Sequence, residues 1–305
     1  MVSQWFHKWL KIFRKAELER MLVRKPWDHA INLKEDFVLR KERMFIMLRQ
    51  EKEEVREFIE EQLRKGYIWP SKSPQTSPVF FVEKKDGKKR MVQDYRYLNK
   101  GTIKDNYPLP LISDLIDTMG TKKVFTKMDL RWGYNNVWVK EEDKWKAVFI
   151  IHLGVYEPTV MFFGLTNLPA TFQAMMNNIL RDLINIGEVA TFMNDILVGT
   201  EDEKKHNEIV EEILRRMEEN DLNIKPKKCV WKTREIDFLG LVMESGEIKM
   251  QEKKVAEVLE WPRPKTVKDV QRFLGLANYY RQFVKDFAKI AKPMRKLVRK
   301  DKKWN

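Results

Sequence analysis

Hydrophobic residues recur along the chain with two spacings, one typical of helices and the other of strands. From residue 2 to residue 20 they recur every three or four positions, which predicts an amphipathic helix. A second helix is predicted from Arg49 to Lys65 and ends at Gly66. Its predicted apolar side consists of Val55, Phe58, Ile59 and Leu63. Residues 25–41 lack this periodicity and predict an extended connector.

Short apolar runs in the middle of the chain predict strands and hairpins. Runs at 79–82 and 90–93 flank Asp86-Gly87, a dipeptide that favours a tight hairpin turn. A second hairpin is predicted where Val189–Met193 and Ile196–Val198 meet at Asn194-Asp195. Further strands are predicted at 124–130, 134–139, 147–151, 159–163 and 236–242.

Helical patterns follow and dominate the end of the chain. Pro169 predicts the start of a helix that reaches about Ile184, because proline suits the first helical turn. A charged helix is predicted at 202–219, with His206 on its solvated surface. The last predicted helices cover 252–260, 267–277 and 278–289. This order predicts an α+β layer that is preceded by a basic hairpin and followed by a helical lobe.

Composition narrows the class of protein. The chain has 305 residues, 43% of them hydrophobic, which predicts one large or two modest globular units and excludes disorder throughout. A single cysteine, Cys229, excludes an intramolecular disulfide scaffold, and only four histidines leave little for a structural zinc site. No apolar stretch is long enough to span a membrane, and the N-terminus does not have the pattern of a signal peptide. We therefore expect an intracellular protein with no membrane partner.

Positive charge is concentrated in two parts of the chain. The net charge is +14, and residues 261–305 carry 14 Lys and Arg against 3 acidic residues. Residues 84–104 carry 8 basic residues against 2 acidic ones. Clustered cations attract a phosphate backbone, because each neutralised phosphate releases counterions. Solvated helix faces explain the same charges, and on charge alone the two interpretations carry equal weight.

Two acidic residues are candidates for chemistry. The sequence has no phosphate-binding loop of the G-x-x-x-x-G-K-[ST] type, no H-E-x-x-H and no G-x-S-x-G. Asp129 lies at the end of an apolar strand and Asp195 at the tip of a predicted hairpin, which is consistent with a magnesium site. Asn-Asp is also good turn chemistry, and Asp129 could simply end its strand. From these residues alone, both interpretations remain open.

Seven segments in order resemble motifs of the reverse transcriptases of Gypsy-like LTR retrotransposons. Thr126–Tyr134 resembles their first catalytic motif, Phe163–Gln173 the second, and Phe192–Val198 the aromatic-x-Asp-Asp box. The other matching segments are Asp94–Lys100, Lys225–Cys229, Phe238–Gly240 and Phe273–Arg281. The resemblance extends from about Lys25 to Lys303, and agreement of this extent in one order does not arise by chance.

The resemblance implies the α+β fold of a right-hand polymerase, with fingers, a ferredoxin-like antiparallel palm and a helical thumb. It implies that residues 25–122 form most of the fingers and 123–247 most of the palm, with fingers residues interleaved at about 140–165. Residues 248–305 would form the thumb, and residues 1–24 an N-terminal amphipathic helix and linker. No RNase H, protease or integrase segment is expected, which is typical of the polymerase portion of a longer polyprotein or of a truncated copy.

The resemblance also implies a reaction and a site. The reaction is the templated addition of deoxynucleoside triphosphates to a primer on RNA or DNA, with two Mg²⁺ ions about 3.5–4 Å apart. Asp129 and Asp195 would be the metal ligands. The substrate-binding residues would be Lys84 and Arg90 on the triphosphate, Tyr134 under the sugar, and Phe163, Gly164 and Gln173 at the nucleotide and template. Lys228, or with less support Lys227, would protonate pyrophosphate. Phe238, Leu239 and Gly240 would form the primer grip.

One position departs from the family pattern. The family box has two aspartates, and in this chain the first is Asn194. A unit charge 4 Å from a metal is worth about 4 kcal/mol per unit of metal charge at an effective dielectric constant near 20. Losing it predicts weakened metal binding and an impaired polymerase, since each 1.36 kcal/mol is about tenfold in rate.

Other interpretations of the chain remain. The main alternative is a catalytically dead nucleic-acid-binding or structural subunit from a decayed element. A scaffold that binds proteins through the N-terminal helix is a third. Other chains derived from the same polyprotein are further candidate partners, and a cytoplasmic particle or the nucleus is the expected location.

Overall fold

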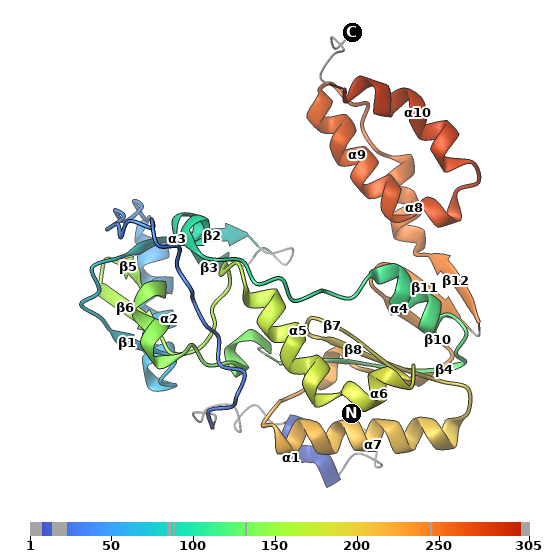
Figure 1. Cartoon of the computed structure of the whole chain (residues 1–305), viewed down its shortest axis with the longest axis horizontal. Coiled ribbons are helices and arrows are strands. Elements are labelled where there is room, and N and C mark those ends of the chain that lie inside the picture. The colour runs from blue at the N-terminus through green and yellow to red at the C-terminus, as the bar shows by residue number, and fades with distance from the viewer. Residues whose placement is uncertain are drawn as a thin grey trace.

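The computed structural model describes residues 8–13, 23–83, 87, 89–131, 133–244 and 246–299. These residues form a mixed α+β molecule with three sheets. Figure 1 shows a four-stranded sheet in the middle, a five-stranded sheet on one side and three helices on the other. Within the described residues, no helix combines the length and the apolar character that crossing a bilayer requires.

The five-stranded sheet and helix α2 (Arg49–Arg64) share one hydrophobic core. Its strands, in the order β1-β6-β5-β2-β3, are β1 (Ile68–Pro70), β6 (Gly154–Pro158), β5 (Phe149–Ile151), β2 (Ser77–Glu83) and β3 (Lys89–Gln93). Val55 and Ile59 of α2 are buried as predicted, whereas Leu63 is exposed. Gly66 has a φ of +70°, so it supplies the left-handed residue that ends the helix. After β3 the chain forms the short helix α3 (Arg96–Gly101).

The middle sheet is antiparallel throughout, in the order β7-β8-β4-β9. Its strands are β7 (Val189–Phe192), β8 (Asp195–Thr200), β4 (Val124–Asp129) and β9 (Val230–Thr233). Helices α5 (Leu168–Ile179), α6 (Arg181–Asn185) and α7 (Glu203–Glu219) pack against the sheet, and α1 (Leu10–Phe13) packs against α7 (Figure 1). Met128, Ile196 and Val198 share the core of these helices. The pairing of all four strands confirms that this sheet is antiparallel, and neighbouring residues of each strand point to its opposite faces.

The opposite face of the middle sheet is covered by a second core. Phe125, Ala190 and Leu197 pack there with residues of a three-stranded meander. The meander consists of β10 (Glu235–Phe238), β11 (Leu241–Glu244) and β12 (Glu247–Met250). Helix α4 (Ile112–Met119) belongs to the same core. The chain then continues into α8 (Glu252–Leu259), α9 (Val267–Tyr279) and α10 (Phe287–Leu297).

Several predicted elements are wrong. The strand predicted at 134–139 starts instead as a short 3₁₀ helix, Gly133–Asn136. The strand predicted at 159–163 lies earlier, as β6. The single strand predicted at 236–242 is two strands, because Leu239 and Gly240 both have positive φ, 49° and 82°, and reverse the chain.

Three further predictions differ from the structure or are described only in part. The helix predicted at 278–289 is not continuous: a 3₁₀ turn at Arg281–Phe283 follows α9, and α10 starts only at Phe287. The loop predicted at 70–78 contains the start of β2. Of the helix predicted at 2–20, the structure describes residues 8–13, in which Leu10–Phe13 form α1; positions 2–7 and 14–20 lie outside the described residues.

His206 is buried rather than solvated, with 1% of its surface exposed. The hydroxyl of Thr200 donates to the carbonyl of Asp202, so it must accept from His206 Nδ1–H, 3.0 Å away. Thr126 Oγ1 lies 2.7 Å from Nε2 and donates to it, while itself accepting from the Lys232 amide. This network fixes a neutral imidazole between α7 and strands β4 and β8. Burial lowers the pKa of His206 to about 4.

Candidate active site

The two aspartates lie side by side on neighbouring strands. In the antiparallel pairing of β4 with β8, Asp129 is directly opposite Asp195. Alternation along the strands puts both on the face that carries Phe125 and Leu197, away from the helices α5–α7. The β7–β8 turn contains Met193, with a φ of +53°, and Asn194, whose carbonyl accepts from the Leu130 amide at 2.9 Å. The turn therefore holds Asn194 next to the end of β4.

Two lysines hold Asp129. Lys225 Nζ lies 3.1 Å from Asp129 Oδ1 and Lys228 Nζ 3.2 Å from Oδ2. Lys228 makes a hydrogen bond, whereas the Lys225 contact is ionic only, since Oδ1 accepts no hydrogen bond. The sequence motif that contains Lys225 was noted, but the residue itself was not expected in the site. Its backbone amide donates to the Asp129 carbonyl, which fixes where its side chain begins.

Burial is the main cause that raises the pKa of Asp195, and the negative charge of Asp129 raises it further. The ammonium groups of Lys127, Lys228 and Lys225 act in the opposite direction. A cation between the two carboxylates would remove the repulsion that raises this pKa.

The amide of Asn194 has an unusual environment. Its Oδ1 is buried and accepts no hydrogen bond. A Cβ atom on Gly133 would lie 2.2 Å from this oxygen, so only glycine fits beside it. A buried carbonyl oxygen without a hydrogen bond, on the residue directly before Asp195, is the type of donor that Mg²⁺ prefers. These residues fit a divalent cation with two full charges, and the described residues contain no group of three or more His, Cys, Asp or Glu side chains that could hold a metal.

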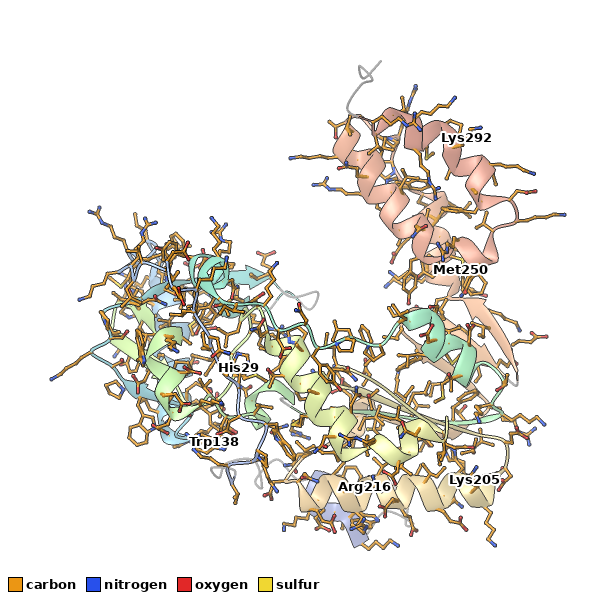
Figure 2. The ribbon with its side chains drawn as sticks, in the orientation of Figure 1. His29, Trp138, Lys205, Arg216, Met250 and Lys292 are labelled. Atoms are coloured by element: carbon orange, nitrogen blue, oxygen red, sulfur yellow. The ribbon has the colours of Figure 1, made fainter. Side chains whose placement is uncertain are left out.

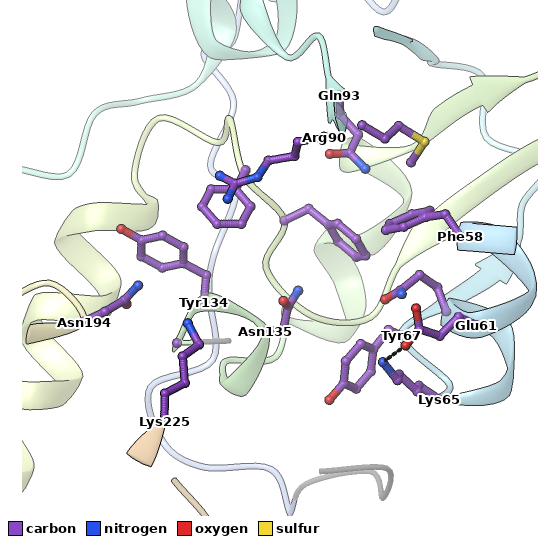
Figure 3. Close-up of a pocket in the computed structure, with 15 residues that line it drawn as sticks. Phe58, Glu61, Lys65, Tyr67, Arg90, Gln93, Tyr134, Asn135, Asn194 and Lys225 are labelled. Carbon is purple, nitrogen blue, oxygen red and sulfur yellow. Dashed lines mark hydrogen bonds and ion pairs between the residues drawn. The ribbon is translucent and has the colours of Figure 1, made fainter. Parts of the chain in front are cut away.

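A pocket of about 450 Å³ opens beside Asn194 (Figure 3). It runs from Asn194, Tyr134 and Lys225 towards α2, where Glu61 and Lys65 form an ion pair. Its remaining lining residues are Phe58, Gln62, Tyr67, Arg90, Met91, Gln93, Gly133, Asn135, Phe162 and Phe163.

Aromatic contacts hold the middle of this pocket together. The Tyr134 ring meets the rings of Phe163 and Phe172 edge-on, with centroids 5.2 Å and 5.3 Å apart. The Arg90 guanidinium lies over the Phe163 ring, 4.9 Å from its centroid. A cation stacked on an aromatic ring keeps its hydrogen-bond donors at the ring's edge available for an anion.

Comparison with known proteins gives the family. A family profile described as reverse transcriptase (RNA-dependent DNA polymerase) matches residues 82–243. The chain belongs to the reverse transcriptase family. It is 39% identical over 81% of its length to the retrovirus-related Pol polyprotein from transposon opus of Drosophila melanogaster, and 34% identical over 79% to that from transposon gypsy. The expected Gypsy-like relationship is thereby confirmed.

The fold comparison agrees. A foamy viral protease–reverse transcriptase in complex with double-stranded DNA superposes on all of this chain with a TM-score of 0.84, at 24% identity and over 55% of that chain. One in complex with an RNA/DNA hybrid has a TM-score of 0.80 and 23% identity, covering 98% of this chain and 40% of that one. The expected α+β polymerase fold is therefore confirmed. The chain spans about a quarter of the length of the opus and gypsy polyproteins.

Two residues of this reverse transcriptase chain that were expected to bind substrate, Gln173 and Gly164, do not line the pocket. Gln173 is fully buried: its amide donates to Thr191 and Asn177, and its Oε1 accepts from the Met193 amide at 3.1 Å. It therefore supports the β7–β8 turn from beneath, and its role at the nucleotide and template stays a prediction. Gly164 is exposed, with a φ of +102°. Lys84 lies outside the described residues.

Asn99, which sequence reasoning did not single out, supports the loop after Phe163. Its side chain donates to the Gly164 carbonyl at 2.7 Å and accepts from the Thr166 amide at 2.9 Å. The resembling segment Asp94–Lys100 contained the signal. Cys229 is partly buried, its thiol donates to the Lys225 carbonyl, and burial raises its pKa to about 11. The thiol is therefore not a nucleophile at neutral pH.

The predicted primer-grip residues form the β10–β11 turn. Phe238 is buried in the second core, and Leu239 and Gly240 make the turn itself. The Tyr279 hydroxyl of α9 donates to the Leu239 carbonyl at 2.5 Å. The Lys127 ammonium donates to the Asp237 carbonyl at 2.6 Å, which ties this hairpin to the strand that ends in Asp129.

Proposed function

We propose that this chain is the RNA-directed DNA polymerase domain of a retrotransposon polyprotein, and that it adds deoxynucleotides to a primer end. One observation carries the proposal: Asp129 and Asp195 face each other beside a pocket that Arg90 and Tyr134 line. Lys225, which contacts Asp129, also lines this pocket, so the carboxylates lie next to a pocket that offers a cation for phosphates and an aromatic wall for a sugar. Membership of the reverse transcriptase family supports it.

We assign the parts of the chain as follows. Residues 25–122 form most of the fingers, 123–247 most of the palm with fingers residues at about 140–165, and 248–305 the thumb. Residues 1–24 precede the fingers. The packing of α4 on the second core supports moving Ile112–Met119 from the fingers to the palm.

Asp129, Asp195 and the Oδ1 of Asn194 would hold Mg²⁺. When bound, the ions would supply positive charge at the primer hydroxyl and at the leaving pyrophosphate. Arg90, together with Lys84, would bind the triphosphate of the incoming nucleotide. Tyr134 would lie under the sugar and exclude a 2′-hydroxyl, with Phe163 and Gly164 at its border.

Lys228 is the proposed proton donor for pyrophosphate. Its side chain is 62% exposed and its ammonium contacts Asp129 at 3.2 Å, which puts a transferable proton beside the reacting region. Phe238, Leu239 and Gly240 would hold the primer end, where Tyr279 fixes their turn.

The macromolecular substrate would be an RNA or DNA template–primer. The foamy viral relatives were solved with an RNA/DNA hybrid and with double-stranded DNA, which supports this class of ligand. Other chains cut from the same polyprotein are further partners, and the reaction would take place in a cytoplasmic particle or in the nucleus.

We infer that the polymerase is impaired. The acidic set around the cation site carries two charges, and two lysines already neutralise one of its members. Asn194 adds an oxygen but no charge. The lysine contacts of Asp129 and the missing charge at Asn194 therefore favour a second candidate function, a nucleic-acid-binding subunit without polymerase activity.

Primer extension on an RNA template with Mg²⁺ separates the two functions. We expect Asn194→Asp to extend the primer at least about 100-fold faster, because a restored charge is worth several kcal/mol beside a metal. The matched control is Asn178→Asp, which adds the same charge at an exposed position of α5 and leaves the rate unchanged. Equally fast extension by the unaltered chain and by Asn194→Asp would refute the impairment. If neither variant extends the primer but both bind it in a salt-sensitive manner, the second function holds.

A further inference from the structure

Helix α1 lies against the part of the palm that carries the lysines of the site. Ile12 and Phe13 are 3% and 7% exposed and belong to the main core, and α1 packs on α7 (Figure 1). Outside the core, Lys8 reaches Glu211 of α7 at 2.8 Å. The described part of the N-terminal segment is thus built into the palm.

Two contacts from α1 flank the lysine segment. The Ile12 carbonyl accepts from the Ile224 amide at 3.0 Å, directly before Lys225. The Phe13 ring meets the Trp231 ring edge-on at 6.1 Å, shortly after Lys228. The residues between these two points carry both ammonium groups that contact Asp129.

The other side of the same segment rests on β4. Ile224 is paired with Leu130, and Val230 with Lys127. The register of the β4–β9 ladder shifts between Phe125 and Lys127. Between Ile224 and Val230 the chain leaves the ladder as a short 3₁₀ turn, Pro226–Lys228. The Lys225 amide bonds to the Asp129 carbonyl, and beyond this contact the position of the turn depends on what packs against its two ends.

We propose that residues 8–13 position Lys225 and Lys228 against Asp129, and so act on the reaction although they precede the residues assigned to the fingers, palm and thumb. In this arrangement Phe13 is a positioning residue: it fixes Trp231, and Ile12 fixes Ile224. The part of the inference that concerns catalysis rests on the proposed polymerase function. The part that concerns geometry does not.

A zero-length carbodiimide crosslink measures this geometry without any catalysis. The reagent joins a carboxylate and an amine that are in contact, and mass spectrometry identifies the peptides joined through Asp129 and Lys225 or Lys228. For Phe13→Ala we expect the yield of this crosslink to fall about fivefold, as a loss of roughly 1 kcal/mol in a contact equilibrium produces. The crosslink between Glu244 and Lys249, which are 2.9 Å apart on β11 and β12, is the internal standard and stays constant.

Two further variants separate positioning from a general loss of structure. Lys8→Ala removes the exposed contact with Glu211 and leaves the crosslink yield unchanged. Phe13→Tyr keeps the ring and restores the yield of the unaltered chain. If Phe13→Ala does not fold, Phe13→Leu is used instead, with hydrogen exchange of the Ile224 amide as a second measurement. An unchanged yield and unchanged exchange in a folded variant would overturn the proposal.

Primer extension then tests the catalytic part, in the Asn194→Asp background. We expect Phe13→Ala to lower kcat with little change in the KM for the nucleotide, because the lysines act on the leaving group. A changed crosslink without any extension by Asn194→Asp would leave the positioning correct and the polymerase function wrong. A changed crosslink with kcat unchanged would overturn the catalytic part alone.

Discussion

Gly133 is the residue on which the position of Asn194 depends most directly. A Cβ there would lie 2.2 Å from Asn194 Oδ1 and 3.0 Å from the Phe172 ring. We expect Gly133→Ala to destabilise the protein by about 1–3 kcal/mol, as overpacking of a filled site does, and to displace the Asn194 amide. Urea unfolding measures the first effect.

Gly275 provides the control for this substitution. Its added Cβ would meet nothing within 4 Å, and it lies inside α9. Gly275→Ala should therefore be neutral or stabilise the protein by up to about 1 kcal/mol, since alanine is the better helix former. If both variants had the same unfolding midpoint, the close packing at Gly133 would be disproved.

Two buried histidines make stability depend on pH. Burial lowers the pKa of both His29 and His206 to about 4. The unfolded chain binds these protons near pH 6.5 and the folded chain only near pH 4. The free energy of unfolding should thus fall as the pH drops below about 6.5, by up to about 1.4 kcal/mol per pH unit for each histidine. Between pH 7 and 8 these groups contribute no slope.

Urea unfolding at pH 7.5, 6.5 and 5.5 checks this pH dependence. His206→Gln removes one of the two groups, so it lowers stability at pH 7.5 but makes the loss towards pH 5.5 smaller. A slope that stays the same in His206→Gln would show that this imidazole does not resist protonation.

Among the elements, those set by local chemistry were predictable from sequence. The 3.6-residue spacing and the cap at Asp202 define α7, and the positive-φ turn at Met193 joins β7 to β8. His206 itself has the phase of the buried stripe that continues at Ile209, Val210 and Ile213. Assigning it to the surface ignored this phase, since charged neighbours dominate the composition of the helix.

Other elements depend on partners that are distant in sequence. The edge strands β1, β9 and β12 are short and were not predicted, because pairing with β6, β4 and β11 defines them. The contact of Lys225 with Asp129 spans nearly a hundred positions, and no periodicity announces it. Asp129 ends β4 and Asp195 begins the antiparallel β8, so the two residues meet at the same end of the strand pair. The sequence could therefore indicate their pairing.

The contact between α9 and the β10–β11 turn links the helical lobe to the three-stranded meander. Tyr279 donates to the Leu239 carbonyl at 2.5 Å, whereas Tyr280 lies 3.5 Å from the Gly240 carbonyl. We expect Tyr279→Phe to cost about 1 kcal/mol of stability, the usual value of a hydrogen bond, and to weaken binding of a primer–template. Tyr280→Phe, which loses only a long contact, should change neither. Equal effects of the two substitutions would contradict the role of this hydrogen bond.

At the scale of the whole molecule, the lysines of the helical lobe lie apart from the candidate active site. Figure 2 shows the side chains of α8–α10, with Lys292 on α10 far from Lys205 and Arg216 on α7. Cations of α7 contact carboxylates: Lys205 contacts Glu188, and Arg215 and Arg216 contact Glu212. Opposite charges in close contact release no counterions when a polyanion approaches. The helical lobe should therefore supply most of the electrostatic affinity for nucleic acid.

The salt dependence of binding tests this division. Lys268, Lys285 and Lys292 are exposed on the helical lobe. Their joint replacement by glutamine should lower the slope of log K against log salt by about one unit for each phosphate contact that is lost, and weaken binding alike for all sequences. Replacing Lys204, Lys205 and Lys232 around α7 by glutamine removes the same charge from another part of the molecule and should leave the slope nearly unchanged. If both triple variants lost the same slope, affinity would follow net charge alone, and the helical lobe would have no special position on the duplex.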